Sequence, residues 1–239
     1  MDNNFENRRR DVTTNDAGMR NFFTKIYGYM AIALGVTALT GLIVQNLFGS
    51  IMAYLTGSIV GILILFGIQF ALISGIGSAM RSNPSRAFVY LMAFAVVEGI
   101  MFSMIFAIFT AASVLSVFLT SASIFAAMAA YGLLVKKSLA GWGSVLVGGV
   151  IGIFVASMIN MFFASAALTF AVSIVGVFIF TGLAAYDTNR LKQVYVEMDT
   201  NGNSSTQVTG VAIYGALTLY LDFINLFFYL LRLTGDTRN

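Results

Sequence analysis

The stretch Ala216–Leu231, ALTLYLDFINLFFYLL, is an apolar run that contains a single charged residue, Asp222. A carboxylate inside a membrane-spanning segment is costly, and it usually faces the interior of a helix bundle or a water-filled cavity. Helical spacing of i, i+3, i+4 and i+7 places one set of residues on a common face. That set is Gly215, Thr218, Asp222, Asn225 and Tyr229. The opposite face is nearly all Leu, Ile and Phe, so the remaining helices must shield this polar stripe from lipid.

The composition of the whole chain is that of an integral membrane protein. Of its 239 residues, 59% are hydrophobic and 10% are charged, whereas a soluble domain carries about 25% charged residues. The chain contains no Cys and no His. Disulfides, Cys nucleophiles, the usual zinc ligands and the usual proton relay are therefore excluded. A pH response near neutrality must come from a carboxylate.

Three long blocks with almost no charge each predict a helical hairpin. Ile26–Met80 is uncharged and as one helix would reach over ~80 Å, against a hydrocarbon core of ~30 Å. Ala87–Val135, interrupted by a single acid, and Ser138–Tyr186 are the other two blocks, and residues 211–233 add a seventh span. We therefore expect an all-α polytopic membrane protein. The outer turns are predicted near residues 46–50, 110–113 and 164–167, and the charged joints at 81–86, 136–137 and 187–199.

The charge distribution predicts the domains and the orientation. Residues 1–25 form a basic arm, expected to be cytoplasmic and partly disordered, residues 26–233 form the transmembrane domain, and residues 234–239 form a short tail. With the arm inside, the cytoplasmic segments carry eleven basic residues and the outer side carries two, as the positive-inside rule requires. The eleven are Arg8, Arg9, Arg10, Arg20, Lys25, Arg81, Arg86, Lys136, Lys137, Arg190 and Lys192, and the two are Arg232 and Arg238. Because these residues flank hydrophobic segments, topology explains the net charge of +3 and no nucleic-acid partner is expected.

Small residues at helical spacing predict close contacts between the spans. The pairs Gly57/Gly61 and Gly148/Gly152 have the spacing that lets helix backbones approach one another in a membrane. Such pairs are common in polytopic proteins, so we attribute only a packing role to them.

Three acids are candidates for function: Glu98 in the third span, Asp187 at the end of the sixth and Asp222 in the seventh. Each also has a structural interpretation. Asp187 could pair with Arg190 at the membrane interface, where an ion pair contributes little. Glu98 and Asp222 could be protonated acids that make structural hydrogen bonds. Intramembrane ionisable residues are functional by default, which favours the functional interpretation for Asp222 above all.

The segments TGLAAYDTNRLK (181–192) and GALTLYLDFINLFFYLLRL (215–233) resemble the last two helices of the transmembrane Bax inhibitor motif family, and its bacterial members in particular. RAFVY (86–90) and KKSLAGWGSVL (136–146) extend the resemblance across the hydrophobic region. The resemblance implies six helices around a central seventh in the cell membrane. It also implies a pH-sensitive calcium leak, in which Ca²⁺ is the transported ion, protons regulate it and no cofactor is needed.

The resemblance also assigns roles to individual residues. The aspartates matching Asp187 and Asp222 form the family's proton-sharing pair, for which an arginine of the second helix can compete. Arg81 is the nearest candidate for that arginine. The residues themselves, rather than the resemblance, suggest Glu98 and Asn225 as further candidate partners of the gate. The family can carry an acid in the second helix where this chain has Gln69, and Glu98 is a candidate to replace it.

Physical reasoning supports a two-acid gate independently of the resemblance. Two carboxylates close together in a low dielectric cannot both ionise cheaply, so they share a proton. The protonated pair bridges two helices, the ionised pair repels, and the freed oxygens suit Ca²⁺. If the sixth span ended at Tyr186, however, Asp187 would lie at the membrane boundary and Asp222 ~16 Å inside. The acids meet only if the sixth helix continues past Asp187 or the seventh begins late.

Two other functional classes compete with a leak channel. An intramembrane aspartyl protease also needs two aspartates, and Tyr186–Asp187 matches half of its pattern. Asp222, however, does not follow a Gly-x-Gly, and with Pro84 as the only proline the Pro-Ala-Leu element is absent. We therefore expect no enzymatic activity. The second alternative is a non-transporting membrane adaptor that regulates a membrane protease or a stress or cell-death pathway through a membrane protein partner.

Overall fold

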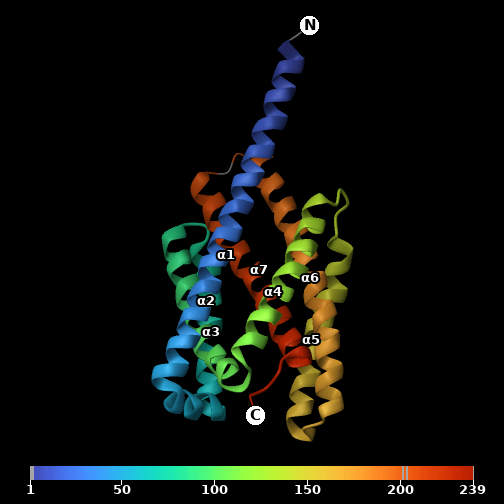
Figure 1. The fold of residues 1–239 in the computed structure, drawn as a ribbon. Coiled ribbons are helices and arrows are strands. Elements are labelled where there is room, and N and C mark those ends of the chain that lie inside the picture. The colour runs from blue at the N-terminus through green and yellow to red at the C-terminus, as the bar shows by residue number, and fades with distance from the viewer. Residues whose placement is uncertain (1–2, 201, 203, 239) are drawn as a thin grey trace.

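The computed structural model describes residues 3–200, 202 and 204–238, which are almost entirely helical (Figure 1). Within them, seven helices are long and apolar enough to cross a membrane. They begin and end as follows: α1 Asn3–Gly57, α2 Ile59–Ala79, α3 Pro84–Ile108, α4 Ala111–Leu134, α5 Gly143–Phe163, α6 Ala166–Thr200 and α7 Ser205–Thr234, with a 3-10 turn at Ala140–Trp142 before α5. α1 starts at one end of the bundle and α7 finishes at the other (Figure 1). The predicted fold class, an all-α protein with seven spans, is confirmed.

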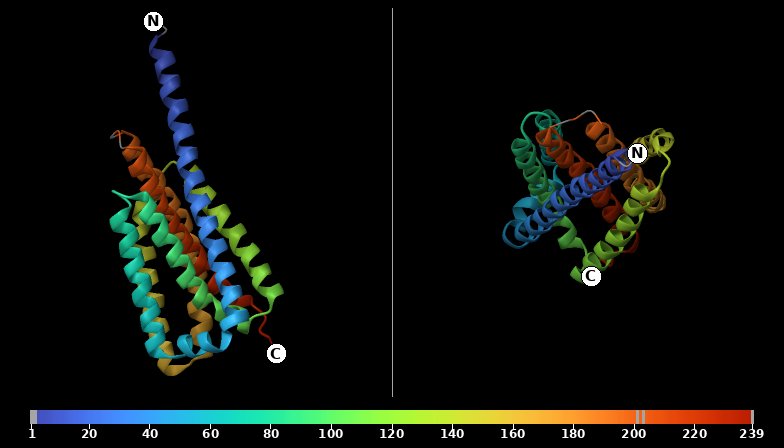
Figure 2. Two further views of the ribbon diagram at one scale, coloured as in Figure 1. Left: turned by 90° about the vertical axis from the view of Figure 1, so that its left-hand side faces the viewer. Right: turned by 90° about the horizontal axis from the view of Figure 1, so that it is seen from above.

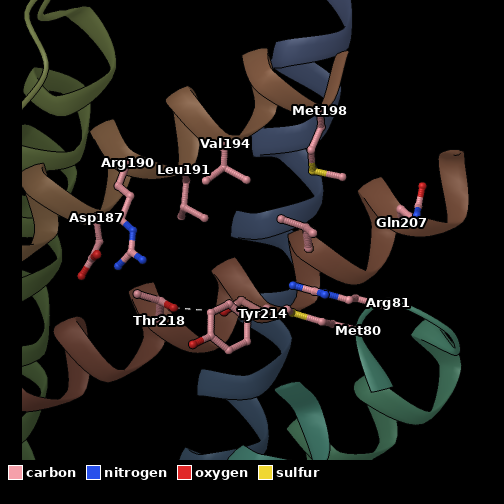
Figure 3. Close-up of a pocket in the computed structure, with 11 residues that line it drawn as sticks. Met80, Arg81, Asp187, Arg190, Leu191, Val194, Met198, Gln207, Tyr214 and Thr218 are labelled. Carbon is pink, nitrogen blue, oxygen red and sulfur yellow. Dashed lines mark hydrogen bonds between the residues drawn. The ribbon is translucent and has the colours of Figure 1, made fainter. Parts of the chain in front are cut away.

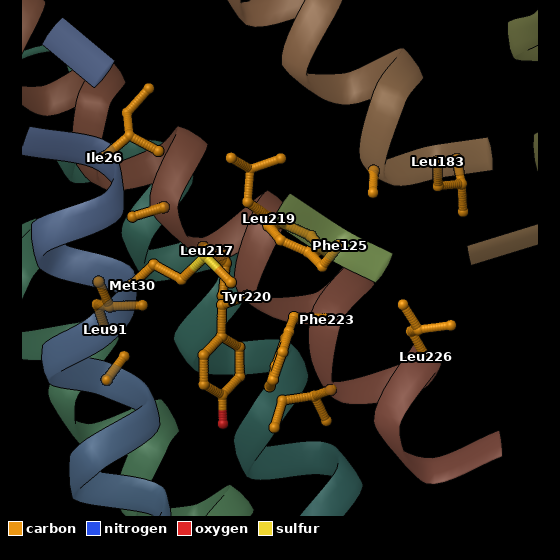
Figure 4. Close-up of a cluster of buried hydrophobic side chains, with 14 of the residues drawn as sticks. Ile26, Met30, Leu91, Phe125, Leu183, Leu217, Leu219, Tyr220, Phe223 and Leu226 are labelled. Atoms are coloured by element: carbon orange, nitrogen blue, oxygen red, sulfur yellow. The ribbon is translucent and has the colours of Figure 1, made fainter. Parts of the chain in front are cut away.

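α7 packs against α1, α2, α3, α4 and α6, whereas α5 packs on α6 (Figure 2). Large α7 side chains such as Leu217, Tyr220 and Leu226 are fully buried (Figure 4). The outer helices instead expose large apolar side chains, among them Ile151 and Phe154 of α5, as expected for surfaces that face lipid. A seventh helix central to all six others stays a prediction, because α5 is joined to the bundle through α6.

The N-terminal arm differs from the prediction of a partly disordered segment that ends at residue 25. Residues 3–25 are helical and continuous with the first span. Phe22, Ile26 and Met30 are buried and follow one another at one-turn intervals, so the packed bundle begins before residue 26. Lys25 lies on the exposed side of the same helix. The prediction rested on the charge of the arm and overlooked the helical spacing of its apolar residues. Extending a helix that is already nucleated costs little, so the first span continues into the arm.

The predicted outer turns lie where the chain reverses. α1 leaves helical geometry at Phe48 (φ −131°, ψ 16°), inside the predicted interval of 46–50. The reversal is completed at Ser58, whose Oγ accepts a hydrogen bond from the backbone N of Gly61 at 3.0 Å and caps α2. The two other turns fall at residues 109–110 and 164–165. These positions agree with hairpins whose length is set by the thickness of the bilayer.

The charged segment 187–199 is not a joint but a continuation of α6. Leu191, Tyr195 and Met198 are buried along one side of it, and the Tyr195 ring lies 5.1 Å from the ring of Phe22. Arg190, Glu197 and Asp199 of this segment are exposed, whereas Asp187 is buried on the same side as Leu191. Beyond Asp187 the segment is therefore an amphipathic helix that packs on α1 near Phe22. The seventh helix likewise begins earlier than predicted, at a capping box that starts with Ser204.

Close helix contacts involve different glycines from those that the sequence singled out. A Cβ at Gly210 of α7 would meet the backbone carbonyl of Met80, and a Cβ at Gly132 of α4 would meet the backbone of α6. Gly148 and Gly152 instead face open space. Spacing alone identified helix faces with small residues, but it did not show which of those faces meets a neighbouring helix.

Candidate functional site: an aspartate pair between α6 and α7

The lengths of α6 and α7 bring Asp187 and Asp222 to the same level of the bundle. At ~1.5 Å per residue, Asp187 lies about 20 Å before the end of α6 and Asp222 about 26 Å after the start of α7. Because the two helices are joined by a short turn and pack side by side, these depths nearly coincide. Of the two conditions that the sequence set for the acids to meet, the continuation of the sixth helix past Asp187 is fulfilled.

The two carboxyl groups are buried and lie within hydrogen-bonding reach of each other. Asp187 is 8% exposed and Asp222 is 5% exposed. Two ionised carboxylates are both acceptors and cannot bond to one another. Oδ2 of Asp222 has no hydrogen-bond partner in the described part of the chain, and an unpaired buried polar atom costs about 1–3 kcal/mol. A single proton held between the two groups makes a bond that the fully ionised pair lacks.

A cavity of about 550 Å³ adjoins the pair between α6, α7 and the end of α2 (Figure 3). Asp187 lines this cavity, whereas Asp222 is absent from its wall. Tyr214 and Thr218 of α7 form part of the lining, and the Thr218 hydroxyl donates to the Tyr214 carbonyl at 3.2 Å. Asp187 is therefore the acid that meets the cavity, and Asp222 is enclosed behind it.

Two arginines line the same cavity on opposite sides (Figure 3). Arg190 lies one turn after Asp187 on α6, and it is near enough for its charge to act on that carboxyl group. Arg81, which the sequence singled out, follows α2 and faces the cavity from the far side. Helical spacing already placed Arg190 beside Asp187, but its i+3 position was interpreted as a surface ion pair.

Glu98 lies in a second polar cluster away from the pair. On α3 it accepts a hydrogen bond from the side-chain amide of Gln69 on α2. The Tyr220 hydroxyl of α7 is 2.7 Å from Oγ1 of Thr37, and Thr37 donates its own proton to the Ala95 carbonyl at 3.0 Å. Tyr220 is therefore the donor to Thr37. Glu98, Gln69, Tyr220 and Thr37 are called the Glu98 cluster below, because the charge of Glu98 acts on Tyr220.

The remaining predicted partner, Asn225, makes its hydrogen bond within its own helix. Its amide donates to the Leu221 carbonyl at 2.8 Å. Within the described residues, no group of three or more acidic side chains is placed to hold a metal ion. The pair thus offers two carboxylates, fewer oxygens than the six to eight that Ca²⁺ takes, so water or backbone oxygens would complete any coordination.

Asn189 and Lys192, which follow Asp187 on α6, hold the end of α4. Neither was recognised as a structural residue from the sequence. The Asn189 amide donates to the Gly132 carbonyl at 3.1 Å, and its Oδ1 accepts from the backbone N of Leu139 at 3.0 Å. Nζ of Lys192 donates to the Leu133 carbonyl at 2.7 Å. The available signal was the helical spacing of apolar residues through this charged segment, which predicts a helix rather than a joint.

The fold and the pair together define a class: a polytopic α-helical membrane protein with a buried two-acid centre between its last two helices. Residues 19–239 match the family described as inhibitor of apoptosis-promoting Bax1. The chain belongs to this Bax inhibitor-1-like family, as the resemblance of its last two spans indicated.

Relatives extend over nearly the whole chain. The chain is 37% identical to the inner membrane protein YbhL of Escherichia coli over 223 residues, which are 93% of this chain and 94% of that protein. An uncharacterized protein of Borreliella burgdorferi is 38% identical over 226 residues, 91% of this chain and 93% of its own length. The uncharacterized protein RP147 of Rickettsia prowazekii is 36% identical over 232 residues, with 95% and 94% covered. The family and the multi-pass membrane location are thus shown for the full bundle.

Proposed function

We propose that this protein is a pH-sensitive leak for Ca²⁺ across the membrane, gated by the Asp187–Asp222 pair. One observation carries the proposal: two buried carboxyl groups from neighbouring helices lie within hydrogen-bonding reach, and one of them lines a cavity. The absence of His from the whole chain leaves carboxyl groups as the side chains suited to sense protons. The proposal involves no cofactor and no catalysis.

The gate acts through the charge of the pair. With one shared proton, the acids bond and hold α6 against α7. When both are ionised, two negative charges about 4 Å apart repel by roughly 4 kcal/mol at an effective dielectric constant of ~20. That repulsion corresponds to about a thousandfold change in an equilibrium between closed and open states, since 1.4 kcal/mol is about tenfold. The pair is therefore strong enough to control whether the two helices remain in contact.

Ca²⁺ enters this mechanism as the transported ion. Once the proton is lost, the carboxylates are hard oxygen ligands of the type that Ca²⁺ prefers. Two carboxylates with water as the other ligands bind weakly, and a permeation site must release its ion as readily as it takes it up. The limited ligand set therefore suits passage of the ion better than storage.

The proposal includes an orientation with the basic N-terminal arm in the cytoplasm, because eleven of the basic residues then lie inside. The lining of the cavity beside Asp187 includes Arg81 and, near the start of α7, Gln207. Cysteines introduced at positions 5 and 237 should react with a membrane-impermeant reagent from opposite faces of a sealed vesicle. Labelling from the same face would remove this orientation.

A flux assay with purified protein separates the leak channel from a non-transporting adaptor. Proteoliposomes loaded with a Ca²⁺ indicator should show protein-dependent Ca²⁺ uptake that changes steeply with pH between about pH 5 and 8. An adaptor gives no uptake above empty liposomes at any pH. Uptake that is constant over this range would leave a leak but exclude the two-acid gate.

A further inference from the structure

α1 and α4 both pack on α7 but do not pack against each other over any length. A groove of about 450 Å³ therefore lies between them, and Figure 1 shows α7 behind the space that separates the two helices. Tyr27 and Leu34 of α1, Phe118 and Leu133 of α4, and Phe223 of α7 are among its lining residues. We call it the α1–α4 groove.

The lining of the α1–α4 groove is almost entirely apolar, and four of its seven α4 residues are alanines. Ala126 and Ala130 line it and are exposed, so the groove opens sideways between two membrane-spanning helices. Water in such a groove would lack the two to four polar partners that it needs. A hydrocarbon chain has no hydrogen bonds to lose there, because the groove continues the surrounding bilayer interior.

The dimensions of the groove fit one lipid chain. Its lining on α4 extends from Phe118 to Leu133, which is about 22 Å at ~1.5 Å per residue. One leaflet accounts for about 15 Å, half of the ~30 Å hydrocarbon core. An extended acyl chain of a single leaflet therefore fits within the groove along its whole length.

The end of the groove is basic. α4 ends one residue after Leu133, and the exposed Lys136 and Lys137 follow after Val135. Lys192 of α6 places its ammonium group on the Leu133 carbonyl at 2.7 Å. One lysine thus contacts Leu133, the last α4 residue of the lining, and two more follow it within four residues of the chain. Basic sites between transmembrane helices recognise anionic lipid headgroups.

We propose that the α1–α4 groove binds one anionic phospholipid, with an acyl chain against Phe223 and the headgroup at Lys136, Lys137 and Lys192. The site is formed by α1, α4 and α7 and is separate from the cavity at Asp187. The charge of the lysines favours an anionic headgroup. The groove holds the acyl chain in place, so that it exchanges with the bilayer less freely than other lipids do.

Two lining residues connect this lipid site to the acids. Phe223 directly follows Asp222 on α7. Tyr27 lies within hydrogen-bonding reach of Thr188, which directly follows Asp187 on α6. An acyl chain in the groove therefore contacts Phe223, the residue after Asp222. It also contacts Tyr27, the partner of Thr188, which is the residue after Asp187. An effect of the bound lipid on the aspartate gate rests on the proposed function, whereas binding of the lipid does not.

Lipid binding is tested with two matched substitutions on the same helix. Ala126 and Ala127 are adjacent and both exposed, and only Ala126 lines the groove. Purified protein in mild detergent is titrated with phosphatidylglycerol or phosphatidylcholine, and bound lipids are counted by native mass spectrometry. The wild type should bind one phosphatidylglycerol at least tenfold more tightly than phosphatidylcholine. Ala126→Phe should weaken that first binding event about tenfold or more, and Ala127→Phe should change it less than twofold.

The lysines provide a second variant that leaves the membrane-embedded surface intact. Lys136→Ala with Lys137→Ala should lower the affinity for phosphatidylglycerol to about that for phosphatidylcholine. Equal loss with Ala126→Phe and Ala127→Phe would overturn the groove as the site, and equal wild-type affinity for the two lipids would overturn headgroup selection. If lipid binding follows these expectations but proteoliposomes show no Ca²⁺ uptake with either lipid, the proposed function fails while the lipid site stands.

Discussion

The bundle contains two acidic sites with different partners, the buried aspartate pair and the half-buried Glu98. Between α6 and α7, Asp187 faces Asp222, and Oδ2 of Asp222 lacks a partner in the described part of the chain. Between α2 and α3, Glu98 faces the amide of Gln69, which donates to it. An amide donor satisfies an ionised carboxylate, whereas a second carboxylate can do so only by holding a proton. The two sites therefore differ in what a proton does: the aspartates need one to bond to each other, whereas Glu98 can accept from Gln69 with or without one.

The two sites also differ in what they join. The Glu98 cluster connects α1, α2, α3 and α7 through hydrogen bonds that need no change of charge. The aspartate pair connects only α6 and α7 and opens on one side to a cavity. We therefore expect the Glu98 cluster to hold its helices together at every pH, and the aspartate pair to release its helices when ionised.

The largest expected effect is on the pH dependence of Ca²⁺ uptake, and it distinguishes the aspartate pair from the Glu98 cluster. Asp222→Asn keeps the size and hydrogen-bonding capacity of the side chain but cannot ionise. It should remove most of the pH dependence of Ca²⁺ uptake between about pH 5 and 8, whatever its basal rate. Glu98→Gln, the matched change in the other site, should keep the wild-type pH profile. If the profile is lost in Glu98→Gln and kept in Asp222→Asn, the roles of the two sites are reversed.

A double variant tests whether the two aspartates act as a unit. Asp187→Asn alone should also flatten the pH profile of uptake, since either change removes the shared proton. Adding it to Asp222→Asn should change the profile little further, because residues that act together are not additive. Two single effects that sum in the double variant would mean that the acids sense protons separately.

The next effect concerns α2, which serves both sites because its middle carries Gln69 and its end reaches the cavity. A Cβ at Gly210 of α7 would meet the carbonyl of Met80 at that end. Gly210→Ala should therefore lower the thermal stability in detergent, with a cost of about 1–3 kcal/mol for forcing the helices apart. Gly148→Ala, where open space is available, should leave the unfolding temperature unchanged or slightly raised.

A smaller effect on stability distinguishes the Glu98 cluster from the aspartate pair. Gln69→Leu removes the donor and leaves Glu98 without its partner, which should cost about 1–2 kcal/mol in the free energy of unfolding. Replacing both residues by Leu should cost less than Gln69→Leu alone, because no carboxyl group is then left without its partner. Thermal unfolding of the two variants in the same detergent measures the difference. A double variant less stable than the single one would contradict the inferred hydrogen bond.

The smallest expected effect compares the two arginines of the cavity. Losing a nearby cation disfavours the ionised form of an acid, so Arg190→Ala should move the midpoint of the pH profile of uptake toward higher pH. The shift should stay below about one pH unit, since an exposed arginine is screened by water and salt. Arg81→Ala, on the far side of the cavity, should shift the midpoint less. A larger shift with Arg81→Ala would favour the arginine that the sequence singled out.

The sequence predicted the membrane spans well because the bilayer imposes a length on every apolar segment. The turns at Phe48, at residues 109–110 and at residues 164–165 all lie within or next to the expected intervals. The prediction failed where a segment is both charged and helical, because charge was interpreted as a sign of a joint or an arm. The segment after Asp187 and the arm before Ile26 are both charged and both helical. The part of the arm from residue 17 onward has a buried side, and it packs on the other segment through Phe22 and Tyr195.

By itself, the sequence determined the class of protein, the number of spans and the acids available to a gate. These follow from composition, from uncharged lengths and from the cost of an ionisable group in hydrocarbon. Only the tertiary structure decided which acids meet. Asp187 reaches Asp222 because α6 continues to Thr200, while Glu98 is paired with Gln69 because α2 lies beside α3. Partners of this kind are set by how helices pack side by side, and residues far apart in the chain carry no local signal of that contact.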